Sequence, residues 1–365
     1  MARISILTPT LTAADAVSND VLGMHDLLTR RGHEVSLFAD DWNLGAFNIR
    51  PAYSALSTSQ NYDDIMIYHH SIGWELGERI LRETAARVIV KYHNVTPAAF
   101  FEGLSPKLQQ LCIKGRAQLS TIARGGHELF LAASEFNLRE LLDAGADAAR
   151  AFVVAPFSQV EELQAAAPDM QVIDKYSDGK TNLVTVGNVR PNKGHVHLIE
   201  AFAEYYYNVN SHARLFIVGG EDETLASYSQ NLRELADLLC IDGAVVFTGR
   251  VSLAELKSYY LVSDAFVITS EHEGFCVPLV EAMGMKLPIT GYATPAIAET
   301  VGNAGIIWPD RDPSLLAESI DSLVSDEAIA LQLGAEGRRR YDQKFSNEAI
   351  ELQFLKTAAA ASIHF

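Results

Sequence analysis

The sequence has few cysteines and no long apolar run. Its three cysteines, Cys112, Cys240 and Cys276, are widely separated and make no C-x-x-C pair. This argues against a disulfide framework and is typical of reduced thiols in a cytosolic protein. No stretch approaches the ~20 consecutive apolar residues that span a bilayer. Because Ala2 and Arg3 lead directly into a strand-like I-S-I-L segment with no leader pattern, we expect a cytoplasmic protein.

Positive charge is also scarce. The sequence holds 29 Lys and Arg against 46 Asp and Glu, a formal net charge of −17, which argues against nucleic acid as a partner. The exception is the segment from Leu104 to Arg124, which has no acidic residue and carries Lys107, Lys114, Arg116 and Arg124. Two interpretations stay open: a peripheral contact with the inner face of an anionic membrane or a phosphorylated lipid acceptor, or an ordinary solvated helix.

The glycine fingerprint of dinucleotide-binding enzymes is missing as well. Neither half of the chain opens on G-x-G-x-x-G, which makes a dehydrogenase the poorest alternative. A chain of 365 residues with 48% hydrophobic and 21% charged residues is typical of a soluble protein with two domains. Strand-like and helix-like segments alternate in both halves, beginning with Ile4 to Leu7, Val21 to Gly32 and His33 to Ala39. This alternation predicts an α/β fold with parallel sheets.

The most informative stretch runs from Phe266 to Gly291. Its apolar start, F-V-I-T-S, predicts a buried parallel strand, and Pro278 suits the first turn of a helix. Backbone amides without helical partners attract anions at such a helix start. Here they belong to Phe275, Cys276 and Val277. Glu273 and Glu281 frame the turn, and the second leans back toward the first. A ligand with both a phosphate and hydroxyl groups, such as a nucleotide sugar, would engage all of these groups.

Two strand-like segments of the first half end in histidine, Asp63 to His70 and Val88 to Pro97. Ligands of α/β sheets gather at the carboxyl ends of strands, where histidine can orient a hydroxyl group or exchange a proton. We expect His93 at the site, together with one of His69 and His70, the other being structural. Metal binding is the competing interpretation. No spaced cysteine or carboxylate accompanies these histidines in the sequence, so no metal ligand is predicted.

The motif E-G-F-x-x-P-x-x-E-A-M, which begins at Glu273, closely resembles the signature of the retaining glycosyltransferases of family 4. The resemblance is strong from Leu183 to Glu299 and only general before Arg150. It implies the GT-B fold, an α/β architecture of two Rossmann-like domains whose parallel sheets face a cleft. It also implies that Glu273 holds the hydroxyl groups of the donor sugar and Glu281 the ribose.

The resemblance also sets the expected domain boundaries. Residues 1–157 would form the acceptor-side domain, and residues 158–180 a linker with a short helix. Residues 181–345 would form the domain that binds the nucleotide sugar. Residues 346–365 would form a terminal helix that crosses back to the first domain.

A second motif of the family, V-G-R-x-x-x-x-K-G, uses its arginine and lysine to neutralise the donor pyrophosphate. Lys193 aligns with the lysine, but Asn188 occupies the place of the arginine. We expect Arg190 to reach the same oxygens from two positions later; the alternative is a surface arginine. His93 matches a histidine that faces the donor sugar.

Further site residues follow from the same resemblance. The expected donor-binding residues are Gly187, Asn188, Gly219, Arg250, Val251, Gly274, Phe275, Cys276, Val277 and Glu281. The paired glycines of the family's first loop are missing, but Asp15, Ser18 and His69 are expected on the acceptor side. For Asp15 a plain helix cap is the alternative.

The expected function is therefore transfer of a hexose from a nucleoside diphosphate sugar, with retention of configuration, without a metal or other cofactor. UDP-glucose is the first expectation for the donor and GDP-mannose the second. The acceptor would be a glycan, a lipid-linked sugar or a small molecule. A GT-B epimerase or hydrolase of nucleotide sugars and a non-catalytic nucleotide-sugar-binding protein remain as alternatives.

Overall fold

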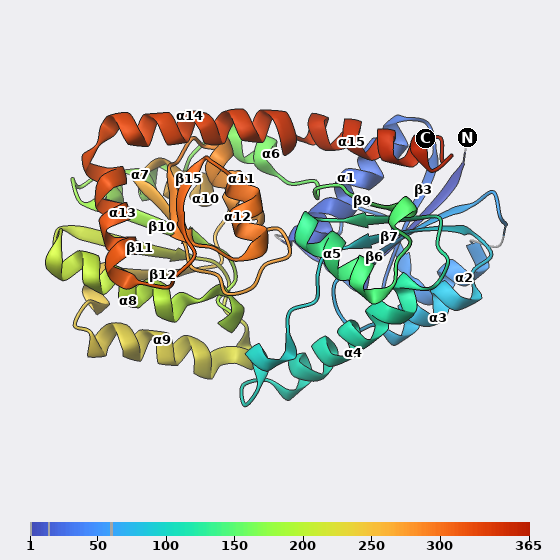
Figure 1. Cartoon of the computed structure of the whole chain (residues 1–365), viewed down its shortest axis with the longest axis horizontal. Helices are drawn as coiled ribbons and strands as arrows, with labels where there is room; N and C mark the ends of the chain where they lie inside the picture. The colour runs from blue at the N-terminus through green and yellow to red at the C-terminus, as the bar shows by residue number, and fades with distance from the viewer. Residues whose placement is uncertain (1, 14, 59–60) are drawn as a thin grey trace. The chain divides into compact units, whose positions relative to one another are not determined.

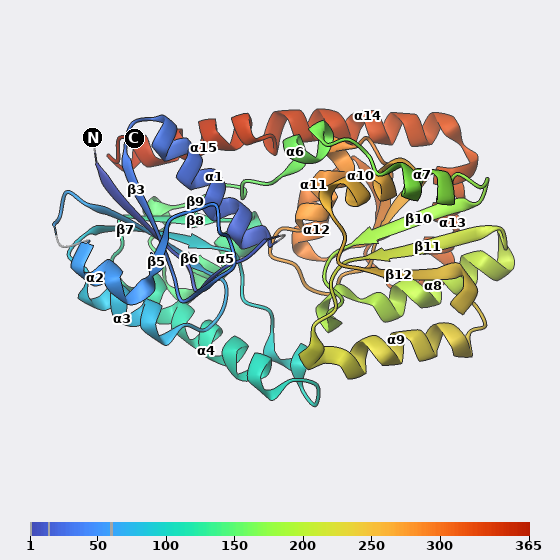
Figure 2. The same ribbon diagram turned by 180° about the vertical axis from the view of Figure 1, so that it is seen from behind.

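The computed structural model describes residues 2–13, 15–58 and 61–365, and the chain forms two compact units (Figure 1). Unit 1 comprises Met1–Ala99, Pro106–Ser158 and Phe345–Phe365. Unit 2 comprises Phe100–Ser105 and Gln159–Lys344. Each unit is an α/β body built on its own parallel sheet, with helices on both faces (Figures 1 and 2).

The described residues of unit 1 form a seven-stranded sheet in the order β5-β3-β1-β6-β7-β8-β9. Its strands are β1 (Arg3–Leu7), β3 (Glu34–Ala39), β5 (Ile49–Pro51), β6 (Ile65–His70), β7 (Arg87–Tyr92), β8 (Leu129–Ala132) and β9 (Ala151–Val153). Its helices are α1 (Ala16–Arg30), α2 (Ala55–Thr58), α3 (Glu75–Glu83), α4 (Pro106–Ala123), α5 (Glu135–Ala144) and α15 (Asn347–Ala360), with a small pair of strands, β2 (Thr10–Leu11) and β4 (Asp41–Trp42). Every residue of β6 is buried, as expected of a central strand covered on both faces.

Unit 2 contains a six-stranded sheet in the order β12-β11-β10-β13-β14-β15 within the described residues. Its strands are β10 (Thr181–Val186), β11 (Ala213–Val218), β12 (Val245–Gly249), β13 (Ala265–Ile268), β14 (Ile289–Tyr292) and β15 (Gly305–Trp308). Its helices are α6 (Val160–Ala165), α7 (Met170–Tyr176), α8 (His195–Asn208), α9 (Ala226–Leu238), α10 (Leu253–Leu261), α11 (Val277–Gly284), α12 (Pro295–Val301), α13 (Pro313–Ser325) and α14 (Glu327–Lys344). The apolar face of α8 packs with the strands in one core, where Leu198, Ile199 and Phe202 are buried.

Both sheets reverse their winding at one point. In unit 1 the order departs in opposite directions from the neighbours β1 and β6, and in unit 2 from β10 and β13. At such a switch point the loops that leave the carboxyl ends of the two strands diverge, so ligands of open α/β sheets bind there. The fold therefore indicates that ligands bind near the residues that follow β1, β6, β10 and β13.

The segments that join the units are packed helices. Residues 158–180, expected as a linker with a short helix, form α6 and α7 in unit 2, where Lys257 donates to the carbonyl oxygens of Gln164 and Ala166 at 2.6 Å each. The chain leaves unit 2 after α14, and α15 belongs to unit 1. There Gln353 donates to the carbonyl oxygen of Val153 at 2.8 Å, and Asn347 to that of Ser158 at 3.1 Å.

We predict that Gly291→Ala destabilises unit 2. A Cβ atom at Gly291 would lie 1.9 Å from the carbonyl oxygen of Ile268, so the substitution forces β13 and β14 apart. The expected loss is about 3 kcal/mol of unfolding free energy, measured by urea denaturation. Gly243→Ala is the matched control, because no atom lies within 4 Å of its Cβ position. Equal stability of the two variants would show that the sheet tolerates the methyl group.

Candidate functional site

The loop after β10 is fastened to the neighbouring strand ends. The amide of Gly187 donates to the carbonyl oxygen of Val218, and the amide of Val189 to that of Gly220, each at 2.9 Å. A short turn, Pro191–Lys193, then leads into α8. Gly194 adopts φ 65°, and a Cβ there would lie 2.1 Å from the carbonyl oxygen of Thr269. Only glycine allows this approach, which holds Lys193 beside the end of β13.

Asn192 ties this loop to the one that follows β13. Its carbonyl oxygen accepts from the amides of Glu271 at 2.9 Å and His272 at 3.2 Å. Its side-chain nitrogen donates to the carbonyl oxygen of His272 at 3.1 Å. Asn192 is not among the residues predicted from the sequence, where its position directly before Lys193 is the only signal for it. These bonds fix the spacing between the lysine and Glu273.

Lys193 and Glu273 form an ion pair at the switch point of unit 2. Lys193 Nζ lies 2.7 Å from Glu273 Oε1, and the two side chains are 22% and 8% exposed. Burial lowers the pKa of Lys193, but the charge of Glu273 and the hydrogen bond to it more than offset this effect, and the net pKa is raised. Lys193 is therefore positively charged, and it lies partly buried beside the carboxylate of Glu273 in the E-G-F motif.

Arg190 adds a second cation near Lys193. The positive charge of Arg190 acts to lower the pKa of Lys193. Arg190 Nη2 lies 3.6 Å from Asp222 Oδ2. Arg190 Nε is buried and has no hydrogen-bond partner among the described residues. A buried N–H without a partner is costly, so this group is available to an anion. Asn188, in the place of the family's arginine, is exposed.

The turn into α11 has an unusual backbone. Cys276 precedes the helix with φ 78°, in the left-handed region, and Pro278 stands in the first turn as predicted. Non-glycine residues rarely adopt this conformation, and such strain is concentrated at ligand sites. Burial raises the pKa of the Cys276 thiol, and the negative charge of Glu273 raises it further. The thiol is therefore neutral and lacks the thiolate form that a nucleophile requires.

Glu281 lies on the same turn and is held by a tyrosine. Tyr260 on α10 donates from Oη to Glu281 Oε2 at 2.8 Å. Burial raises the pKa of Glu281, and this hydrogen bond opposes the increase. Both Glu273 and Glu281 act on the Cys276 thiol, so both carboxylates lie near the start of α11. Sequence reasoning missed Tyr260, because nothing in the pattern of α10 distinguishes it from a core tyrosine.

The remaining donor-side residues surround the same strand ends. The amide of Gly219 donates to the carbonyl oxygen of Gly249 at 3.2 Å. Arg250 is exposed after β12, and its guanidinium atoms lie 3.7 Å from the Cβ position of Gly220. Val251 follows, half-buried. The expected donor-binding residues thus belong to the loops that follow β10, β11, β12 and β13 and to α11.

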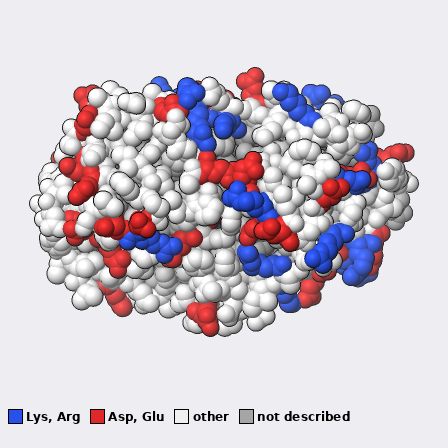
Figure 3. All heavy atoms as spheres, in the orientation of Figure 1, with Lys and Arg blue, Asp and Glu red and all other residues white. Residues whose placement is uncertain are grey.

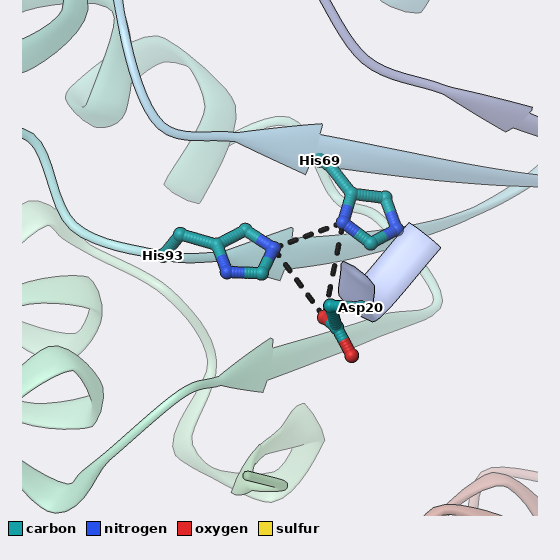
Figure 4. A group of neighbouring side chains, drawn as sticks. All are labelled: Asp20, His69 and His93. Atoms are coloured by element: carbon teal, nitrogen blue, oxygen red, sulfur yellow. Dashed lines mark hydrogen bonds and ion pairs between the residues drawn. The ribbon is translucent and has the colours of Figure 1, made fainter. Parts of the chain in front are cut away.

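The histidines of unit 1 meet at its own switch point, where sequence reasoning missed a carboxylate. Asp20 on α1 lies with His69, at the end of β6, and His93, just after β7 (Figure 4). His93 Nε2 is 2.9 Å from His69 Nδ1 and 3.4 Å from Asp20 Oδ2, and His69 Nδ1 is 3.9 Å from Asp20 Oδ2. His70 lies outside the group and bonds to the carbonyl oxygen of Gly115 at 3.0 Å.

Lys91 is the fourth member of this group. Its Nζ lies 3.7 Å from Asp20 Oδ2, and both side chains are fully buried. Burial raises the pKa of Asp20 and lowers that of Lys91, and in each case the charge of the partner opposes the shift. One atom each from Asp20, His69 and His93 lie within 4.8 Å of one another, close enough for a metal ion. Lys91 already balances the carboxylate, however, and the absence of a metal stays a prediction.

Asp15 and Ser18, expected on the acceptor side, have structural partners. Asp15 caps α1, and its Oδ2 accepts from the amide and the hydroxyl group of Ser18 at 2.8 Å each. Ser18 Oγ in turn accepts from the amide of Thr12 at 3.0 Å. The helix cap weighed as the alternative for Asp15 is therefore present, and both side chains are used locally.

The basic segment of α4 is partly neutralised. Lys114 pairs with Glu75, and Arg116 pairs with Glu140 at 2.9 Å. On the face shown in Figure 3, basic and acidic side chains are interspersed. None of the described helices combines the length and apolarity needed to cross a bilayer.

The chain is similar to known proteins in sequence and in structure. A family model described as "Glycosyl transferases group 1" matches residues 170–340, the part of unit 2 that holds Lys193, Glu273 and Glu281. Residues 170–340 of the chain thus belong to the glycosyl transferases group 1 family. It is 24% identical over 304 residues to N-acetyl-alpha-D-glucosaminyl L-malate synthase of Bacillus anthracis, a match that covers 81% of this chain and 74% of the relative.

Two further proteins are similar to this group 1 glycosyltransferase, one over part of the chain and one over nearly all of it. A GDP-mannose-dependent alpha-(1-6)-phosphatidylinositol monomannoside mannosyltransferase of Mycobacterium tuberculosis is 27% identical over 168 residues, 44% of this chain and 42% of the relative. The structure of Anabaena HepE in complex with UDP-glucose superposes with a TM-score of 0.77 at 16% identity, covering 99% of this chain and 100% of the other. The expected GT-B fold and enzyme class are thereby confirmed.

We predict that the enzyme loses stability in mild acid. Burial lowers the pKa of His69 to about 3 and that of His70 to about 4, whereas an unfolded histidine titrates near 6.5. Below pH ~6.5 the unfolded chain therefore binds more protons than the folded one, and the free energy of unfolding falls by about 1.4 kcal/mol per histidine and pH unit.

Urea denaturation between pH 7 and pH 5 measures this slope. His70→Gln keeps a donor for the carbonyl oxygen of Gly115 but removes one titrating group. The unfolding free energy of this variant should therefore fall less steeply with decreasing pH, by the contribution of one histidine. An unchanged slope in the variant would mean that His70 is protonated in the folded enzyme.

Proposed function

We propose that this group 1 glycosyltransferase transfers a hexose from a nucleoside diphosphate sugar to a hydroxyl group of a glycan, a lipid-linked sugar or a small molecule, with retention at the anomeric carbon. The observation that carries the proposal is the Lys193–Glu273 ion pair, 2.7 Å long, at the start of α11. It combines a cation for the diphosphate with a carboxylate for sugar hydroxyl groups.

Stabilising the leaving group is the main task of such a site. As the bond between the anomeric carbon and the diphosphate oxygen breaks, negative charge develops on the diphosphate. Lys193, Arg190 and the amides before α11 supply positive charge and hydrogen-bond donors for it. Because the cations and amides fill this role, we propose that transfer needs no metal ion.

The carboxylates position the donor. Glu273 accepts hydrogen bonds from the sugar when the diphosphate takes over its contact with Lys193. Glu281, held through one oxygen by Tyr260, has its other oxygen for the ribose. The acceptor oxygen attacks from the side of the leaving group, and its proton passes to the diphosphate. No enzyme nucleophile is required, which agrees with the raised pKa of the Cys276 thiol.

Similarity favours two donors. The structural neighbour HepE binds UDP-glucose, and the mycobacterial relative is named as GDP-mannose-dependent. We propose UDP-glucose first, in line with the structural likeness over the whole chain, and GDP-mannose second. We leave membrane contact out of the proposal, because Lys114 and Arg116 are already ion-paired.

We predict that Lys193→Ala lowers kcat about 100-fold, a loss of about 3 kcal/mol in stabilisation of the leaving diphosphate. Transfer from a radiolabelled nucleotide sugar to a panel of acceptors measures it. Lys180→Ala is the matched control, because Lys180 precedes the opposite end of the same strand, β10. Free sugar or an epimer as the product would instead indicate the hydrolase or epimerase. A rate near that of the wild type in Lys193→Ala would refute the assigned role.

We also predict that the donor stabilises the folded enzyme. A nucleotide bound only by the folded state adds about 2.7 kcal/mol at a hundred times its Kd, which raises the melting temperature. Differential scanning fluorimetry with UDP, GDP and their sugars ranks the donors. Stabilisation by none of them would contradict the proposal, and tight binding without any turnover would favour a non-catalytic binding protein.

A further inference from the structure

The group formed by Asp20, His69, Lys91 and His93 has one point of contact with the exterior. The side chains of Asp20, His69 and Lys91 are 0% exposed, whereas that of His93 is 7% exposed. A substrate can therefore touch His93 but none of the other three. Whatever the buried members do for the reaction, they do through His93.

The contacts of His93 decide where its proton lies. Its Nε2 faces two groups, the Nδ1 of His69 at 2.9 Å and the Oδ2 of Asp20 at 3.4 Å (Figure 4). A hydrogen atom on His93 Nε2 would be attracted by the Asp20 carboxylate, whereas a lone pair there would be repelled by it. The same hydrogen atom can be accepted by His69 Nδ1. The carboxylate thus favours the Nε2–H form of His93, in which Nδ1 carries the lone pair, and His69 stabilises that form when its Nδ1 is unprotonated.

Asp20 is itself held in place. Its Oδ1 accepts from the amide of Phe157 at 2.8 Å, which leaves Oδ2 toward the histidines. Lys91 Nζ, 3.7 Å from that oxygen, also donates to the carbonyl oxygens of Val154 and Ala155. The carboxylate cannot turn without losing the bond to Phe157, and the charge of Lys91 opposes the increase in the pKa of Asp20 that burial causes.

We propose that Asp20 and His69 are positioning residues for His93: they hold its imidazole as the Nε2–H tautomer, so that Nδ1 is presented as an acceptor to a substrate hydroxyl group. The second half of the proposal rests on the proposed glycosyl transfer. The first half does not, because the tautomer is a property of the protein without substrate.

The geometry favours hydrogen bonding over a metal ion at this place. The two imidazole nitrogens lie 2.9 Å apart, a normal length for a hydrogen bond. The charge that a cation would need from Asp20 is already balanced by Lys91. His70, also on β6, is a further titratable group whose charge acts on His93, and it bonds to the carbonyl oxygen of Gly115.

Asp20→Asn tests the tautomer directly. Because the amide of Phe157 still requires an acceptor, the asparagine oxygen stays there and its NH2 group takes the place of Oδ2. That NH2 group is a donor, so His93 Nε2 must become the acceptor and the proton must move to Nδ1. NMR of protein with 15N-labelled histidine, without substrate, distinguishes the two tautomers by the shifts of the ring nitrogens. We expect Nε2–H in the wild type and Nδ1–H in Asp20→Asn.

The kinetic expectation follows from the lost acceptor. In Asp20→Asn kcat should fall roughly 100-fold, while KM for the donor stays near its wild-type value. If Asp20→Asn does not fold, His69 gives the same test: His69→Phe should lose activity and show both tautomers of His93. His69→Asn, which can place an amide oxygen where Nδ1 lies, should restore both properties. His70→Gln is the matched control for a buried histidine on β6 and should leave kcat unchanged.

Three outcomes would overturn the proposal: an Nδ1–H tautomer in the wild type, a tautomer that Asp20→Asn or His69→Phe leaves unchanged, or a stoichiometric metal ion in the purified enzyme by elemental analysis. A protein that shows the expected tautomers but transfers no sugar would instead count against the proposed function. The NMR and kinetic results therefore separate the two.

Discussion

The ion pair between Lys193 and Glu273 is the interaction around which the unit 2 site is arranged. Neither charge would be stable alone at this depth, since an unpaired buried ion costs several kcal/mol. The pair holds together because Gly194 lets its loop approach Thr269 and Asn192 joins the loops that follow β10 and β13. The sheet brings these two strands together at its switch point, and the side chains then need only local bonds to meet.

Unit 1 repeats this principle with different chemistry. Its switch point lies between β1 and β6, and the residues that gather there are a carboxylate, two histidines and a lysine. In unit 2 the ion pair is partly exposed and able to exchange partners with an anion. In unit 1 the ion pair of Asp20 and Lys91 is fully buried, and only His93 reaches outward. We propose that Lys193 of the first pair binds the diphosphate and that Asp20 of the second holds His93 in one tautomer.

Sequence reasoning succeeded where the chemistry is local. The strand, turn and helix from Phe266 to Gly291 follow from apolar patterning, a proline in the first helical turn and the spacing of two glutamates, and the family model matches this region. It failed where contacts join distant parts of the chain. Asp20 meets residues 49 and 73 positions later, Tyr260 meets Glu281 across two helices, and no periodicity encodes either pairing. The segment 158–180, expected as a linker with a short helix, contains the two helices α6 and α7, which pack on α10 and α11.

The most direct test is a crystal structure of the enzyme in complex with an unreactive analogue of the donor, chosen after the binding experiments have identified that donor. We expect diphosphate oxygens at hydrogen-bond distance from Lys193 Nζ. We also expect that Glu273 is released from the lysine to contact sugar hydroxyl groups, while Glu281 contacts the ribose and keeps its bond to Tyr260. A donor bound away from the start of α11, with the Lys193–Glu273 pair undisturbed, would contradict the proposed roles of these residues.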